Sequence, residues 1–195
     1  MKIVEAPVRN HSARPPGAEI NCVVLHDTQT LNVAGVIAWF NDPSSQVSAH
    51  YTIDRDGTIY RHVDEARKAW HAGRSSLWGM DDLNVDSVGI ELVDADDREP
   101  YPDAQLGALV DLTEDLCRRH PIPLNRIIGH QHVAPGRKPD PGADFDWRGF
   151  LIVVGARLAE RFMPAVAPQP TTAHAGPRIA GTFAFGLLAA LGALW

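Results

Sequence analysis

Cysteine is scarce in this chain, which has only Cys22 and Cys117 among its 195 residues. Two thiols cannot cross-link a domain of this length, so the sequence excludes a disulfide-built scaffold and indicates a reducing compartment or a fold indifferent to redox state. A surplus of positive charge is missing as well, because 18 Lys and Arg stand against 24 Asp and Glu. Binding to nucleic-acid phosphates needs clustered cationic side chains, and nucleic acid is therefore excluded as the main partner.

An apolar leader is also missing, since residues 1–17 contain no hydrophobic run and carry several charged side chains. We therefore expect no signal peptide and a cytoplasmic location for the domain. The chain shows no internal repeat, and we expect a monomer.

Charge is nearly absent from residues 164–195, where Arg178 is the single charged side chain. This contrast predicts a folded domain over residues 1–163, a proline-rich linker over 164–178 and an apolar tail over 179–195. A helix made of that tail would be about 25 Å long, slightly short of a bilayer core of about 30 Å. We expect a C-terminal apolar helix that tethers the domain to the inner membrane. The alternative is a disordered or self-packed tail.

Strand-like and helix-like segments alternate between residues 20 and 160. Apolar, β-branched runs predict strands, and hydrophobic residues three or four apart predict helices. The pair Asp56-Gly57 indicates a hairpin turn. This order favours one α/β domain in which a mixed central β-sheet is flanked by helices. The expected strands are 21–26, 48–53, 58–63, 87–93 and 126–129, the expected helices are 32–40, 102–119 and 147–158, and a long polar loop is expected over 130–145.

Side chains with catalytic chemistry stand at strand ends or in the adjoining loops. His26 follows a buried strand, and Glu91 lies inside an apolar one. The proline-rich loop displays His130, His132, Lys138 and Asp140. Imidazoles and a carboxylate form a ligand set for catalytic zinc, which keeps a fourth position for water and lowers the pKa of that water to about 7. Glu91 could then transfer protons, and Lys138 could stabilise an oxyanion. The alternatives are structural histidines, a solvent-facing Glu91 at a sheet edge and a surface loop without chemistry.

Several short motifs occur in a fixed order between residues 20 and 150, at positions 23–26, 47–51, 55–57, 69–73, 88–92, 129–142 and 145–147. Together they resemble the zinc-dependent N-acetylmuramoyl-L-alanine amidases of the type-2 amidase superfamily. The resemblance implies that the zinc ligands are His26, His130 and Asp140. It implies Glu91 as the catalytic acid and base, and Lys138 as the group that stabilises the transition state.

Three further histidines stay open at this point. His132 is the weaker ligand candidate, but two imidazoles two residues apart in an extended segment could point the same way. His50 and His71 lie within the shared motifs, and the sequence assigns them no chemistry.

The activity that the resemblance implies is hydrolysis of the amide between N-acetylmuramic acid and the L-alanine of peptidoglycan. Within the family that the chain resembles, the recycling enzymes tend to carry a longer insertion between the positions of His26 and His50 than this chain has. The resemblance therefore favours an endolysin-like, bacteriolytic enzyme that degrades the cell wall. The alternative is a cytosolic recycling amidase that acts on 1,6-anhydro-muropeptides. An alternative of another class is a non-catalytic peptidoglycan-binding module, which the complete set of candidate residues disfavours.

Overall fold

The computed structural model describes residues 1–94 and 100–160. Its central sheet contains β1 (Ile3–Glu5), β3 (Cys22–Asp27), β4 (Tyr51–Ile53), β5 (Ile59–Arg61), β9 (Ser87–Leu92) and β10 (Ile127–Gly129). The spatial order is β1-β5-β4-β9-β3-β10. Strands β4, β9, β3 and β10 are parallel to one another, whereas β5 is antiparallel to β4. The sheet is therefore mixed, as the sequence predicts.

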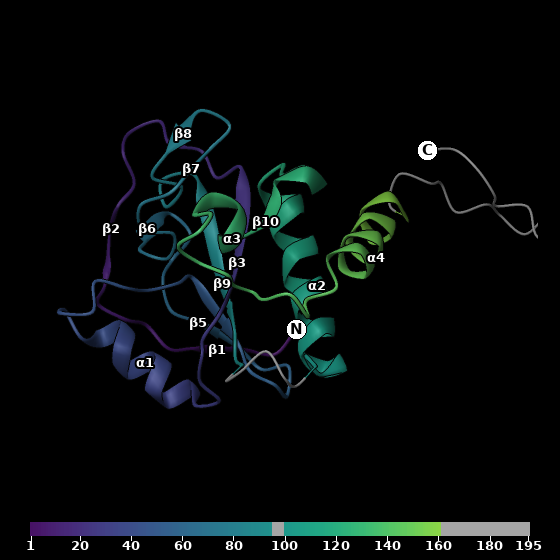
Figure 1. The fold of residues 1–195 in the computed structure, drawn as a ribbon, viewed down its shortest axis with the longest axis horizontal. Helices are drawn as coiled ribbons and strands as arrows, with labels where there is room; N and C mark the ends of the chain where they lie inside the picture. Colours follow the sequence, from purple (N-terminus) through teal and green to yellow (C-terminus); the bar gives the residue numbers. More distant parts are fainter. Residues whose placement is uncertain (95–99, 161–195) are drawn as a thin grey trace, which may run out of the picture. The chain divides into compact units, whose positions relative to one another are not determined.

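Helices cover both faces of this sheet (Figure 1). On one side lie α2 (Asp103–Arg119) and α4 (Trp147–Glu160), and on the other lie α1 (Val33–Asn41) and the single-turn α3 (His130–Val133). Two small two-stranded sheets complete the fold; they pair β2 (His11–Ala13) with β6 (Arg67–Ala69), and β7 (Ser76–Leu77) with β8 (Met80–Asp81). A short 3-10 helix, Leu124–Arg126, precedes β10.

Alternation along the two central strands decides which side chains reach each face. Val23 and Leu25 of β3, with Ile90 of β9, pack into the main core under α2 and α4. Because successive side chains of a strand point to opposite faces, His26 and Glu91 lie on the other face, beneath α1 and α3. The two residues are paired in register across β3 and β9. The same periodicity that buries the core therefore brings two polar side chains together.

The predicted elements are confirmed to within a few residues, with one correction and several omissions. The segment expected as a loop from residue 130 begins with one helical turn, α3. Strands β1, β2, β6, β7 and β8 were not predicted, because two or three residues are too few to display a periodicity. Among the described residues, no helix is both long enough and apolar enough to span a membrane. The predicted linker and apolar tail lie outside the described residues.

Candidate metal centre and active site

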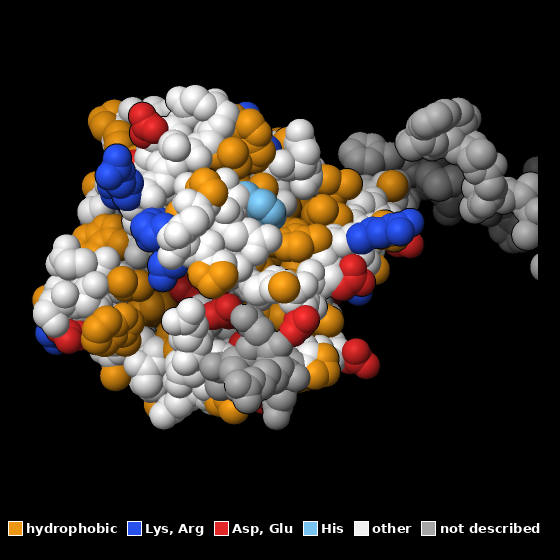
Figure 2. Space-filling view, viewed as in Figure 1, with side chains coloured by type: hydrophobic (Ala, Val, Ile, Leu, Met, Phe, Trp, Pro, Cys, Tyr) orange, Lys and Arg blue, Asp and Glu red, His pale blue; other side chains and the backbone are white. Residues whose placement is uncertain are grey.

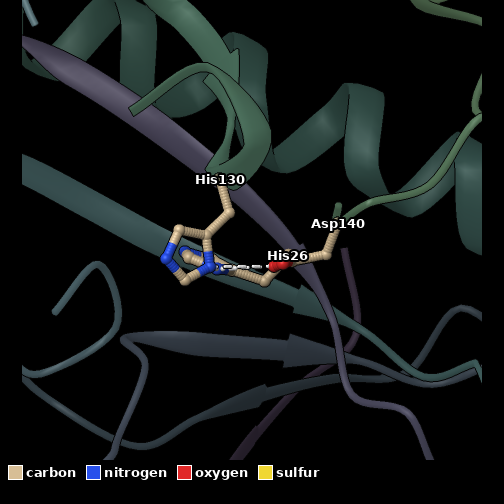
Figure 3. A group of neighbouring side chains, drawn as sticks. All are labelled: His26, His130 and Asp140. Carbon is tan, nitrogen blue, oxygen red and sulfur yellow. Dashed lines mark hydrogen bonds and ion pairs between the residues drawn. The ribbon is translucent and has the colours of Figure 1, made fainter. Parts of the chain in front are cut away.

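Three side chains meet with their ligand atoms facing one another (Figure 3). Nδ1 of His26 lies 2.9 Å from Nδ1 of His130, and Oδ2 of Asp140 lies 3.1 Å from the first nitrogen and 3.0 Å from the second. All three residues are buried. The structure thus brings together the three ligands that the sequence predicts.

The carboxyl ends of the parallel strands supply two of these residues. His26 is near the end of β3, and His130 directly follows β10, its neighbour in the sheet. Asp140 returns from the following loop, where its carbonyl accepts a hydrogen bond from the backbone N–H of Gln131 (3.0 Å). Gly129 permits this approach, because a Cβ there would lie only 2.8 Å from Cδ of Pro141.

The donor set fits a small divalent cation. Ligands about 2.0–2.1 Å from a tetrahedral zinc ion stand roughly 3.3 Å apart, close to the separations found here. Burial lowers the pKa of His26 to about 4, so its imidazole is neutral at pH 7 and can act as a ligand. Burial opposes ionisation of Asp140, but its hydrogen bonds with His130 and His26 outweigh this and lower the pKa of the carboxyl below its usual value. Within the described residues, Oδ1 of Asp140 has no hydrogen-bond partner.

Glu91 is a buried carboxyl beside this centre. It stands between His26 of β3 and Thr52 of β4, so it lies in the middle of the sheet and not at a solvent-facing edge. Glu91 is only 8% exposed. Among the described residues, its Oε2 has no hydrogen-bond partner. Burial, followed by the charges of Asp140 and Asp27, raises the pKa of Glu91 well above its usual value. This carboxyl therefore holds a proton more readily than an exposed glutamate does.

A cavity of about 540 Å³ opens onto the centre. The five predicted site residues all line it, and Lys138 contributes an exposed ammonium group. Figure 2 shows hydrophobic side chains gathered over α1 and Lys and Arg side chains above them. Trp39 of α1 and Arg137 also line the cavity, and sequence reasoning missed both. The one signal for Arg137 was its place beside Lys138; for Trp39 there was none, because a helix periodicity marks buried residues and Trp39 is 55% exposed.

The helical turn of α3 decides between the two histidines of the loop. Nδ1 of His132 accepts a hydrogen bond from the backbone N–H of Gly129 (2.9 Å), and its ring packs edge-on against Trp147. His132 is not among the grouped metal-ligating side chains, so the hypothesis that it points the same way as His130 is wrong. In a helix, residues two apart do not share a face.

The other two motif histidines lie deeper in the protein. His71 contacts His26, with 3.1 Å between Nδ1 of His71 and Nε2 of His26. Nδ1 of His50 accepts a hydrogen bond from the backbone N–H of Gly89 (3.0 Å), which ties β9 to the segment before β4. His71 therefore supports the centre directly, and His50 supports the strand that carries Glu91.

The sequence profile of the N-acetylmuramoyl-L-alanine amidase family (Amidase_2) matches residues 16–143. The chain belongs to this family. It is 45% identical over 109 residues to the 1,6-anhydro-N-acetylmuramyl-L-alanine amidase AmpD of Citrobacter freundii, an alignment that covers 56% of the chain and 58% of that protein. The chain thus spans a little over half the length of this curated relative. The family resemblance predicted from the motifs is confirmed.

Solved structures support the same grouping. A selenomethionine derivative of AmpD is 34% identical to this amidase-family chain, with a TM-score of 0.70 over 78% of the chain and 93% of that structure. AmiD from Escherichia coli, in complex with the substrate anhydro-N-acetylmuramic acid-L-Ala-D-gamma-Glu-L-Lys, is 30% identical, with a TM-score of 0.65 over 72% of the chain and 60% of that structure. A mutant endolysin from Bacillus subtilis covers 80% of the chain with a TM-score of 0.61, but at 23% identity this likeness concerns the fold alone.

Proposed function

We propose that this chain hydrolyses the amide between the lactyl group of N-acetylmuramic acid and the L-alanine of the stem peptide, with Zn²⁺ as its cofactor. The observation that carries the proposal is the convergence of His26, His130 and Asp140 beside the buried carboxyl of Glu91, in a member of the amidase family. A module that only binds peptidoglycan needs neither facing ligand atoms nor a buried carboxyl oxygen without a partner. The site therefore supports the enzyme over the binding module.

Each side chain has a distinct task in the proposed reaction. His26, His130 and Asp140 hold the zinc ion, which when bound polarises the scissile carbonyl and lowers the pKa of water. Glu91 accepts a proton from the attacking water and passes it to the leaving amine of L-alanine. Its place suits this task, because the carboxyl is buried beside the three proposed ligands and its Oε2 has no hydrogen-bond partner among the described residues. The ammonium of Lys138 stabilises the negative charge that develops on the carbonyl oxygen.

The preferred substrate in our proposal is a soluble 1,6-anhydro-muropeptide, which was the alternative at the level of sequence. The relative at 45% identity carries that substrate in its name, and the AmiD complex contains an anhydro-N-acetylmuramic acid peptide. The endolysin reading rested on the short connection from His26 to His50. That connection contains α1, which lines the cavity through Val36, Trp39 and Phe40.

A direct comparison of substrates tests this proposal. We expect the purified chain to cleave soluble anhydro-muropeptides faster than it releases peptides from intact sacculi, and we expect a chelator to abolish both activities. Faster release from sacculi would restore the endolysin reading, and activity that survives complete metal removal would contradict the zinc mechanism.

Two variants separate metal binding from proton transfer. His26→Ala should lose both zinc and activity, because one of three ligands is gone. Glu91→Gln should keep zinc and lose about 10²- to 10⁴-fold in turnover, because the amide cannot accept the proton. Glu160→Gln, which changes an exposed carboxylate at the end of α4, is the matched control and should retain activity. Near wild-type turnover in Glu91→Gln would remove Glu91 from the mechanism.

The cytoplasmic location, the monomeric state and the membrane tether remain predictions. Residues 179–195 lie outside the described part of the chain, so the tether rests on composition alone. Membrane fractionation of the full chain and of a chain ending at residue 178 tests it. Equal recovery of both forms in the soluble fraction of a detergent-free lysate would contradict a tether.

A further inference from the structure

His71 stands behind the metal centre, on the side of His26 away from the other two ligands. Its Nδ1 lies 3.1 Å from Nε2 of His26, and its Nε2 lies 3.1 Å from the hydroxyl oxygen of Ser87. The Ser87 hydroxyl in turn donates to the carbonyl of Leu83 (2.5 Å). All four residues are at least 95% buried, so water does not compete for these hydrogen bonds.

The direction of each hydrogen bond in this series follows from its last member. A backbone carbonyl only accepts, and a serine hydroxyl has one hydrogen, so the Ser87 hydrogen points to Leu83 and its oxygen is left to accept from His71. A neutral imidazole carries one N–H, which in His71 is therefore on Nε2, and Nδ1 becomes an acceptor. That acceptor takes the N–H at Nε2 of His26. The lone pair of His26 is thereby directed from Nδ1 into the metal centre.

The residue after His71 acts on the second imidazole ligand. The carbonyl of Ala72 lies 3.1 Å from Nε2 of His130, which places the N–H of His130 on Nε2 and leaves Nδ1 facing the centre. The backbone N–H groups of His71 and Ala72 both donate to Oδ1 of Asn84, at 2.9 and 2.7 Å. The dipeptide His71-Ala72, held by Asn84, therefore contacts Nε2 of both His26 and His130, the ring nitrogens that face away from the centre.

We propose that His71 and Ser87 are positioning residues of the metal site, which hold His26 in the tautomer that presents Nδ1 to the cation. The inference rests on the metal site of the proposed function. Neither residue is a ligand. Ser87 acts on His71, and His71 acts on His26, which would bind the metal. Hydrogen-bond partners of this kind raise metal affinity, because the histidine side chain already has the required ring orientation and tautomer before the metal binds.

Zinc affinity and nitrogen-15 NMR of the histidine rings test the proposal in the full chain. Ser87→Ala should weaken zinc binding about 10-fold, and His71→Leu about 10- to 100-fold. His71→Gln should recover much of the loss, because an amide can accept from His26 and donate to Ser87. Ser48→Ala is the matched control: Ser48 is equally buried and its hydroxyl oxygen accepts from the backbone of Trp70, outside the series. It should leave zinc affinity unchanged.

The NMR measurement separates this inference from the proposed function. In the wild-type chain we expect the N–H of His71 on Nε2, with or without zinc, and we expect both tautomers of His71 in Ser87→Ala without zinc. A wild-type His71 with its N–H on Nδ1, or a Ser87→Ala protein with wild-type zinc affinity, would overturn the positioning role. If the wild-type chain bound no zinc, the proposed function would fail, while the tautomer of His71 would still decide whether the hydrogen-bond series exists.

Discussion

Gly89 offers a sharp test of how the sheet supports the metal centre. The ring of His71 lies where the side chain of residue 89 would stand, since a Cβ built on Gly89 would be 2.3 Å from Cγ and 2.7 Å from Nδ1 of His71. Carbon atoms in contact are about 3.5–4.0 Å apart, so Gly89→Ala must push the ring by roughly 1 Å. The ring cannot move freely, because Asn84 holds its backbone and Ser87 and His26 hold its two nitrogens.

The size of the effect follows from this displacement. A shift of about 1 Å changes the length and the alignment of the 3.1 Å contact between His71 and His26, and so weakens this hydrogen bond. We expect zinc affinity to fall about 10- to 100-fold, as it does when the hydrogen-bond partner of a metal-ligating histidine is removed. The crowding itself should lower the free energy of unfolding by about 1–3 kcal/mol.

Gly107→Ala is the control for this prediction. Gly107 lies inside α2, and nothing stands within 4 Å of the position that a Cβ would take there, so the added methyl group meets no neighbour. Alanine should raise the stability of this helix by about 0.5–1 kcal/mol and leave zinc binding unchanged. Urea denaturation of the metal-free proteins and competition with a zinc-binding dye measure the two effects. Wild-type zinc affinity in Gly89→Ala would refute the reasoning.

Three further predictions concern charge and capping. Lys138→Met should lower turnover about 10²- to 10³-fold and keep the zinc content, measured by kinetics and metal analysis, if its ammonium stabilises the transition state. Burial opposes ionisation of Glu65, but hydrogen bonds from Arg119, Tyr51 and His120 outweigh it and lower the pKa of Glu65 to about 2. Because that pKa is depressed in the folded state, the stabilisation is present above the unfolded pKa of about 4.5 and is lost as the pH falls toward 2. Glu65→Gln should therefore cost about 1–2 kcal/mol at pH 7, after allowance for solvent screening, and much less near pH 3; an equal cost at both pH values would contradict this. Asp146→Ala should lose about 1 kcal/mol in urea denaturation, because Oδ1 of Asp146 accepts the N–H of Gly149 (2.9 Å) at the start of α4.

Much of the site was predictable because its residues obey local rules. Alternation along β3 and β9 already puts His26 and Glu91 on a shared face once the two strands are neighbours. The proposed ligands followed from the chemistry of their side chains and from the family motifs. His132 was the open alternative, and it failed because α3 turns a segment that looked extended into one helical turn. A four-residue helix between Gly129 and Ala134 is too short to show a periodicity from which it could be recognised.

The sequence by itself determined the layers of the fold, the polar positions on the central strands and the residue types that can bind a cation. These properties depend on local periodicity and side-chain chemistry, which a linear sequence carries in full. Only the tertiary structure decided which nitrogen of each histidine faces the centre and which residues hold it there. His71, Ser87 and the Ala72 carbonyl are 45, 61 and 58 residues from the imidazoles they orient, directly or in series. Such contacts arise from the packing of distant segments against one sheet face, and no spacing in the sequence records them.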